Sequence, residues 1–471
     1  MRFWILLAAC LPLSAQIDPA TRELSRGILK QLIETNTTNS SGDNTAAARA
    51  MAQRLLDAGF APADVTVLVP PDHPTKGNMV ARFRAPGSTL QPILFIGHLN
   101  VVEALRSDWT TNPFELVEKD GYFYGRGTQD MKSQDATLVT TFIRLKREHY
   151  APSRDLILAL TSDEEGGPAN GVDWLLQTHR ELIDAEFTLN ADAGGVMTEK
   201  GKPIDVEVAA AEKLYADFQL TATNRGGHSS LPRPENAIYE LVHALDRIEH
   251  SPFPFELNAV TRAYFERRAT HESAQNSRDM KAMLADPPDA AAIARLSADP
   301  LFNSLLHTTC VATRVNAGHA NNALPQTAQA IVNCRILPGH PAEEVRQQLI
   351  RIVGDPQITI RYVSDSGEVS ERAPDKAGAK PSIPGPEILK PMEAIADAMW
   401  PGAPVVVDME TGASDSKYTI AAGIPSFGIG ELAIDHDDIR AHGKDERVRV
   451  SSFYEGVDFF YRYMKALSGS R

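Results

Sequence analysis

The sequence has few cysteines and no long apolar segment. Only three of its 471 residues are cysteine, which excludes a small scaffold held together by disulfides. No segment approaches the roughly 20 apolar residues that a membrane span needs, so we expect no stable membrane span. The sequence also shows no internal repeat and no low-complexity tract. With 43% hydrophobic residues, the chain is expected to be globular.

Positive charge is also scarce. The 47 Lys and Arg residues are outnumbered by 61 Asp and Glu residues, and the formal net charge is −14. Sequence-independent binding to nucleic acid needs a basic surface that displaces counterions, so we expect no nucleic-acid partner. The length of 471 residues is too great for one ordinary core and predicts two domains.

The N-terminal residues 1–15 are typical of a short secretory signal peptide. They contain one basic residue, an apolar stretch, and the small residues Ser14 and Ala15 at the end. We therefore expect a secreted or periplasmic protein. Two alternatives stay open, namely a buried N-terminal strand and a bacterial lipoprotein anchored at Cys10.

If that segment is removed, only Cys310 and Cys334 remain. Both lie in runs that read as strands, residues 308–315 and 328–337. A hairpin of these strands would place the two cysteines opposite each other, and an exported protein could oxidise them. Two buried free thiols are the other possibility.

Two different patterns divide the chain. From Asp18 to about Ala210, apolar runs of strand length alternate with segments of helical period, which predicts an α/β fold. Residues 212–365 follow the order strand, helix, long helical insert, two strands, helix and strand, which predicts an inserted domain of the split βαβ type. A linker rich in Pro, Gly and Ser then precedes a second α/β segment. The predicted parts are residues 16–211, the inserted domain 212–365 with its helical insert 254–307, the linker 366–386 and residues 387–471.

The expected elements of the α/β part can be read from periodicity and capping residues. Helices are predicted at residues 45–58, 131–148, 170–183, 388–399 and 452–467, and strands at residues 78–83, 92–98, 155–161, 187–192 and 204–209. The aromatic stripe of the last helix favours core packing over a cofactor site.

An acidic pair follows the apolar run 156–161. Glu164 and Glu165 stand at the start of a glycine-rich loop, where successive side chains point in different directions. One glutamate can then bind a metal while the other faces a bound molecule. Taken alone, such a pair is more often a solvated turn.

Four further segments end in side chains that can bind metals. His98 ends a predicted strand, Asp130 lies between a glycine turn and a helix, Asp192 follows a third strand, and His442 precedes the last helix. Singly, each has an ordinary interpretation, such as a helix cap. In open α/β sheets, however, the carboxyl ends of the strands face one crevice. Imidazoles and carboxylates together suit zinc at about 2.0–2.2 Å, and one carboxylate can bridge two ions.

With these motifs in this order, the chain resembles the zinc-dependent aminoacylase and carboxypeptidase family, and most of all its carboxypeptidase S branch. The resemblance runs from about Ile28 to Met464. It implies a three-layer zinc-peptidase catalytic domain, with an inserted α+β domain of ferredoxin-like type. In relatives, this domain acts as a lid and mediates dimerisation, so a homodimer through it is expected.

The resemblance also implies roles for the site residues. Two zinc ions per subunit would be held by His98 and Asp192 on one side, by Glu165 and His442 on the other, and by Asp130 as the bridge. Glu164 would be the general base that activates a water molecule at the metals and then protonates the leaving amine.

Three residues of the inserted domain are implied to act on the substrate. His228, in a Gly-Gly-His-Ser-Ser turn, would stabilise the developing oxyanion, across the dimer interface in some relatives. Asn322 and Arg335 match positions that bind substrate, and Arg335 would grip a carboxylate through two hydrogen bonds. Without the resemblance, His228 reads as a turn residue and Arg335 as an exposed strand residue.

The sequence departs from the family at Asn100, where an aspartate usually orients the strand-end histidine. We expect the amide oxygen of Asn100 to accept the imidazole N–H of His98 without adding charge. The metal held by His98 would then bind more weakly or react differently. Glu103 replaces a usual proline, so the loop on the substrate side is expected to differ. The acidic cluster 435–438 matches no family ligand and is interpreted as a solvated loop.

Together these features predict an exported dinuclear zinc hydrolase. Its substrates would be small peptides or N-acyl amino acids that carry a free carboxylate. Deacylase rather than carboxypeptidase activity is one alternative. An exported binding protein with weak or no turnover, because of Asn100, is another.

Overall fold

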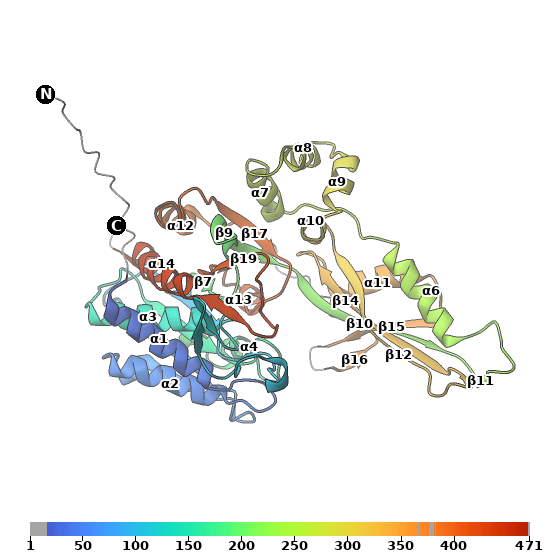
Figure 1. Cartoon of the computed structure of the whole chain (residues 1–471), viewed down its shortest axis with the longest axis horizontal. Helices are drawn as coiled ribbons and strands as arrows, with labels where there is room; N and C mark the ends of the chain where they lie inside the picture. Colours follow the sequence, from blue (N-terminus) through green and yellow to red (C-terminus); the bar gives the residue numbers. More distant parts are fainter. Residues whose placement is uncertain (1–16, 365–366, 376–380, 382, 470–471) are drawn as a thin grey trace.

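The computed structural model describes residues 17–364, 367–375, 381 and 383–469. The predicted signal peptide, with Cys10, lies outside the described residues, as does part of the predicted linker. Figure 1 shows two lobes joined side by side, with a small group of helices above the junction. No helix in the described part of the chain is long and apolar enough to cross a membrane.

The larger lobe is built on a ten-stranded sheet. Its order is β1-β2-β6-β3-β7-β18-β9-β8-β19, and β17 pairs with β9 beside this path. The central strands β3, β6 and β7 are parallel, and all their residues are buried, which explains their uninterrupted apolar runs. The strands are β1 (Val65–Leu68), β2 (Asn78–Phe83), β3 (Ile93–His98), β6 (Leu156–Thr161), β7 (Phe187–Asn190), β8 (Gly195–Glu199), β9 (Lys202–Glu212), β17 (Val405–Glu410), β18 (Ser426–Gly428) and β19 (Ala433–Asp435).

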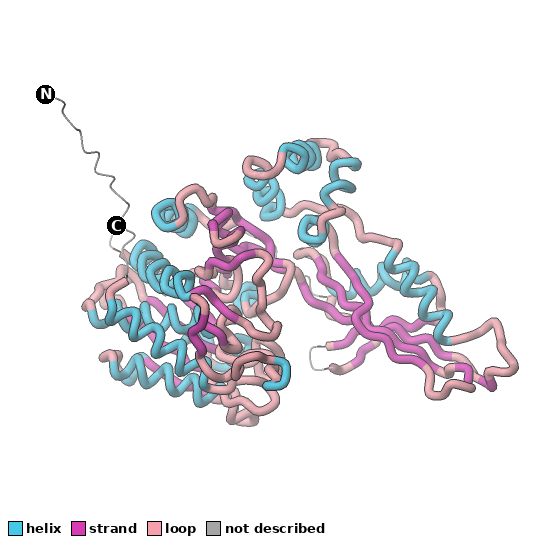
Figure 2. Tube along the Cα trace, in the orientation of Figure 1, coloured by secondary structure: helices cyan, strands magenta, loops and turns pink. Residues whose placement is uncertain are grey.

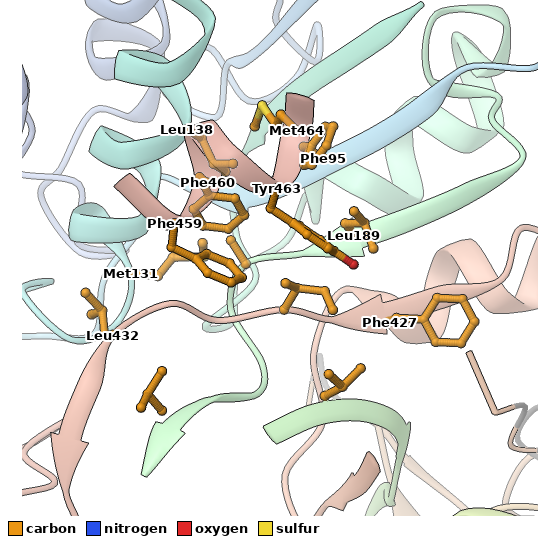
Figure 3. Close-up of a cluster of buried hydrophobic side chains, with 14 of the residues drawn as sticks. Phe95, Met131, Leu138, Leu189, Phe427, Leu432, Phe459, Phe460, Tyr463 and Met464 are labelled. Carbon is orange, nitrogen blue, oxygen red and sulfur yellow. The ribbon is translucent and has the colours of Figure 1, made fainter. Parts of the chain in front are cut away.

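Helices cover both faces of this sheet, as the predicted three-layer α/β fold requires. One face carries α1 (Pro19–Glu34), α2 (Asn44–Asp57), α3 (Lys132–Arg147), α12 (Pro386–Met399) and α14 (Val450–Ser468). The other face carries α4 (Gly171–Thr178), α5 (Arg180–Ile183) and α13 (Ser416–Ala421). The aromatic stripe of α14 lies in the core, where Phe459, Phe460 and Tyr463 approach Phe95 of β3 and Leu138 of α3 (Figure 3).

The smaller lobe has a five-stranded antiparallel sheet of order β12-β14-β10-β15-β16. Its strands are β10 (Leu214–Thr223), β12 (Thr309–Ala317), β14 (Thr327–Ile336), β15 (Ile358–Val363) and β16 (Val369–Ser370). Two helices, α6 (Ala237–Glu249) and α11 (Ala342–Val353), pack on one face of the sheet (Figure 2). This is the inserted α+β fold that the element order predicts.

The predicted helical insert contains α7 (Ala259–Arg268), α8 (Ala274–Met283), α9 (Ala290–Leu296) and α10 (Pro300–Leu306). Helix α7 packs against β17, so the insert touches the larger lobe, and Arg268 forms an ion pair with Asp205 of β9. Two short strands, β11 (Gly227–His228) and β13 (Ala323–Leu324), pair at the end of the smaller lobe that lies farthest from the larger one (Figure 1).

Some details differ from the sequence prediction. The expected helix 170–183 is interrupted at His179, although Asn170 caps its first part by accepting the N–H of Asp173. A small sheet of β4 (Val117–Lys119), β5 (Tyr122–Tyr124) and β20 (Arg447–Arg449) was not expected from the sequence, because its strands are too short to show a period. Cys310 and Cys334 face each other across β12 and β14 and form a disulfide, the first of the two alternatives.

Candidate metal centre

Six predicted site residues meet at the carboxyl ends of the central strands. They are His98 at the end of β3, Glu164 and Glu165 in the loop after β6, Asp192 just after β7, Asp130 just before α3, and His442 in the loop between β19 and β20. Parallel strands place their carboxyl ends along one edge of the sheet, which brings these distant residues together.

Asp130 lies between the two histidines. Its Oδ1 is 3.1 Å from Nε2 of His98, and its Oδ2 is 3.0 Å from Nε2 of His442. Asp192 approaches the same nitrogen of His98 at 3.4 Å, and Glu165 approaches that of His442 at 2.9 Å. The two oxygens of one carboxylate thus face two different imidazoles, each with its own further carboxylate, which is the arrangement of a bridging ligand.

The donor set fits divalent metal ions. Nε2 of His98 and Oδ1 of Asp130 are buried and have no hydrogen-bond partner among the described residues, although they face each other. Their lone pairs can therefore both point at a cation. The groups His98, Glu164, Asp192 and His98, Asp130, Glu165 each bring three donor atoms within 4.8 Å of one another. Mixed imidazole and carboxylate ligands are those of zinc.

The excess of negative charge also fits a cation site. Hydrogen bonds that His442 donates to the carboxylates of Asp130 and Glu165 raise its pKa to about 10. Burial opposes the charge of His98, but Asp192 and Asp130 outweigh it and raise its pKa well above the ordinary value. Burial, reinforced by nearby carboxylates, also raises the pKa of Glu164 well above its ordinary range. Like charges crowded at one place are relieved by protons or by metal ions.

The prediction for Asn100 is wrong about the atoms involved. Nδ1 of His98 lies 3.0 Å from the main-chain carbonyl oxygen of Asn100, not from its side chain. The side-chain Oδ1 accepts the main-chain N–H of Glu164 at 3.1 Å. The chain turns directly after β3, so the carbonyl two residues on faces back to the ring and frees the amide for the neighbouring loop. Asn100 therefore orients the segment of Glu164.

A buried network that the sequence did not reveal holds the two halves of the site together. Glu446 accepts hydrogen bonds from the main-chain N–H groups of residues 127, 129 and 130, and it pairs with Arg126 at 2.6 Å. Arg126 also donates to the carbonyl oxygen of Gly443, next to His442. Arg126 lies in the glycine turn before Asp130, and Glu446 lies shortly after His442; this nearness to predicted ligands was the available signal.

The three predicted substrate residues do not join this group within one chain. His228 lies in β11 at the far end of the smaller lobe, where its ring contacts Ser230, and the carbonyl of Asn322 accepts the N–H of Ser229. Arg335 lies at the opposite end of the sheet, next to the larger lobe, with its guanidinium 4.8 Å from the ring centre of Tyr215. Among the described residues, no hydrogen bond or ion pair links these three to the six.

The interpretation of the acidic cluster 435–438 as a solvated loop is wrong for its two ends, although His436 and Asp437 are exposed. Asp435 is buried, pairs with Arg449, and accepts hydrogen bonds from Thr198 and from the N–H of Gly201. Asp438 pairs with Arg440 and Arg447. Arg440 is only two residues from Asp438, but Arg447 and Arg449 lie nine and 14 residues from their partners, so the sequence around the cluster did not identify them.

A comparison with protein-family models covers most of the chain. Residues 94–466 match the model described as peptidase family M20/M25/M40. The chain belongs to this family. Its resemblance to zinc aminoacylases and carboxypeptidases is thereby confirmed, and this M20 member is a metal-dependent hydrolase.

Named relatives of this M20 protein agree with that assignment. It is 28% identical to the "probable carboxypeptidase S-like 2" of Dictyostelium discoideum over 397 residues, 82% of this chain and 74% of that one. It is also 28% identical to the "N-fatty-acyl-amino acid synthase/hydrolase PM20D1" of Homo sapiens over 390 residues, 80% and 74% of the two chains. The M20 metallo-carboxypeptidase Sso-CP2 of Sulfolobus solfataricus has the same fold, with a TM-score of 0.69 at 15% identity over 94% of this chain and 99% of that one.

Proposed function

We propose that this M20 hydrolase uses two zinc ions to cleave the amide bond of a small peptide or an N-acyl amino acid that carries a free carboxylate. The observation that carries the proposal is Asp130, whose two oxygens face His98 and His442 separately. The named relatives support the substrate class, since one is called carboxypeptidase S-like and another a hydrolase of N-fatty-acyl amino acids.

In this proposal, His98 and Asp192 hold one ion, Glu165 and His442 hold the other, and Asp130 contacts both. When bound, the two zinc ions polarise the scissile carbonyl and lower the pKa of a water molecule. The side chain of His442 is 55% exposed, so the centre opens to solvent on that side and a substrate can reach it.

Glu164 is the proposed proton carrier. Its Oε2 lies 3.9 Å from Nε2 of His98, close to the centre but outside the tightest group of donors. This position beside the centre lets Glu164 accept a proton from a water molecule held there. The same proton then passes to the leaving amine.

The smaller lobe supports a homodimer. Every residue of β12 from Val311 to Ala317 is exposed on this edge strand, and the apolar side chains of Val311 and Val315 are 60% and 59% exposed. An unpaired apolar edge can pair with a strand of a second molecule.

In the proposed dimer, His228 of the partner subunit completes the centre, since His228 of the same chain is remote. Val311→Lys is expected to give monomers in ultracentrifugation and to lower activity, whereas a wild-type monomer with full activity would exclude this role of His228.

Export and substrate recognition are further parts of the proposal. The N-terminal segment 1–15 and the disulfide of Cys310 and Cys334 support an oxidising compartment outside the cytoplasm. Arg335 supplies positive charge for the substrate carboxylate. The binding-protein alternative has lost its main support, because Asn100 does not hold the ring of His98 through its side chain.

Zinc stoichiometry together with hydrolysis of dipeptides and of short- and long-chain N-acyl amino acids tests the function. We expect two zinc ions per chain, turnover of at least one substrate class, and a fall of about 10²–10⁴-fold in kcat with zinc retained in Glu164→Gln. Preference for N-acyl amino acids over dipeptides would identify a deacylase. Two zinc ions without any turnover would favour a binding protein, and activity that survives in Glu164→Gln would overturn the assigned base.

A further inference from the structure

A buried ion pair lies directly beside the acidic loop that carries Glu164 and Glu165. Nζ of Lys76 is 2.6 Å from Oδ1 of Asp163, and the two side chains are only 7% and 0% exposed. Lys76 comes from the segment before β2, far from the loop in sequence. Buried lysines and aspartates are rare unless they are paired, since each charge loses its hydration. The contact is therefore a fixed feature of this site.

Asp163 determines the path of the loop. Its second oxygen, Oδ2, accepts the N–H of Ala169, which closes the turn between the two ends of the loop. Its backbone has φ +58°, a left-handed conformation that few residues other than glycine adopt. There is no room for a side chain at Gly167, where a Cβ would lie 2.2 Å from Oδ2 of Asp163. The carboxylate of Asp163 thus fills the interior of the loop.

Lys76 ties this loop to its neighbours. The carbonyl oxygen of Lys76 accepts the hydroxyl of Ser162, and its Nζ also donates to Oδ1 of Asn39 at 2.7 Å. Next to Asn39, the main-chain N–H and hydroxyl of Ser40 both donate to Glu103, each at 2.9 Å. Lys76 is thus the link between the acidic loop and the loop that holds Glu103.

We propose that Lys76 is a positioning residue for Glu164 and Glu165, and that it acts through Asp163. Because Glu164 and Glu165 follow Asp163 immediately, a rotation of the Asp163 backbone would swing both side chains. Asn100 holds the main chain of Glu164 from the other side. Lys76 and Asn100 therefore fix the acidic pair from two directions, while neither side chain takes part in the chemistry.

The test removes both charges of the pair at once, in K76M/D163N, so that no unpaired charge remains buried. The matched control is E343Q/R346M in α11 of the smaller lobe, which removes an equally buried pair with two contacts of 2.8 Å, remote from the metal centre. Both variants are measured for zinc content, kcat and KM, and for hydrogen exchange of residues 162–170 by mass spectrometry. The single variant K76M is not used, because it would leave the buried carboxylate of Asp163 without its partner.

For K76M/D163N we expect faster exchange in residues 162–170 and a loss of about 10–100-fold in kcat at saturating zinc, with KM changed less than threefold. The control should keep wild-type values of kcat and of exchange in this segment, even if both variants melt at lower temperature. Unchanged exchange, or faster exchange with kcat within twofold of the control, would overturn the role of Lys76. If the wild type hydrolyses no substrate, the proposed function fails, and the exchange measurement alone then decides the inference.

Discussion

Replacement of Asn100 tests how the base is held. In Asn100→Ala, the main-chain N–H of Glu164 loses its acceptor at 3.1 Å, in a place where Asn100 is only 1% exposed. An unpaired buried donor costs about 1–3 kcal/mol. If this cost raises the activation free energy, because Glu164 is no longer held in its orientation in the transition state, kcat drops by roughly 5- to 150-fold. Asn100→Asp keeps an oxygen acceptor, so its kcat should stay within a few-fold of the wild type.

The assay is steady-state hydrolysis at saturating zinc, with zinc content and urea unfolding measured on the same samples. Asn44→Ala is the matched control, because Asn44 is a buried asparagine whose side chain has no hydrogen-bond partner among the described residues. It should leave kcat unchanged, whatever its effect on the free energy of unfolding. The reasoning is refuted if Asn100→Ala keeps kcat within twofold of the wild type, or if Asn100→Asp loses as much activity as Asn100→Ala.

Three further predictions concern the metals and the disulfide. Zinc binding at pH 7 should release protons, because the pKa of His442 is raised to about 10 and this histidine is protonated before the metal binds; the raised pKa of His98 acts in the same direction. Zinc affinity should therefore rise with pH, and calorimetry in buffers of different ionisation enthalpy that detects no released proton would contradict this. In Glu446→Gln, the zinc content measured by elemental analysis should fall from two ions per chain toward one, because the loop of His442 loses its anchor. A content of two ions per chain would contradict this role of the buried network. Replacing Cys310 and Cys334 by serine should lower the free energy of unfolding of the smaller lobe by about 3.5 kcal/mol, because the disulfide closes a loop with a sequence separation of 24 residues. An unchanged midpoint of urea unfolding would show that the crosslink contributes nothing.

Much of the fold and the centre could be predicted from the sequence for one physical reason. Strands buried on both faces appear as uninterrupted apolar runs, and their carboxyl ends must share one edge of the sheet. His98, Glu164 and Asp192 each stand at or just after such an end, so their convergence follows from the strands alone. Asp130 precedes α3 and His442 lies in the loop before β20, so neither ends a buried strand, and it was the resemblance to a known family that predicted their place in the centre.

The features that could not be predicted depend on contacts that leave no periodic pattern in the sequence. The pair of Arg126 and Glu446 joins residues 320 positions apart, and no local pattern identifies such a partner. The choice between the main-chain and side-chain oxygens of Asn100 depends on how the chain turns over two residues. Asp435 was interpreted as solvated because its partners Thr198, Gly201 and Arg449 are brought to it only by folding.

The connectivity of the larger lobe has a consequence for biosynthesis. His98, Asp130, Glu165 and Asp192 are translated before the smaller lobe, but His442 and the strands β17, β18 and β19 are translated after it. Under the proposed assignment, a ribosome-bound chain would carry the complete ligand set of only one ion. The second ion would be captured only after the C-terminal strands have docked beside β7 and β9, and metal loading would then follow the order of synthesis.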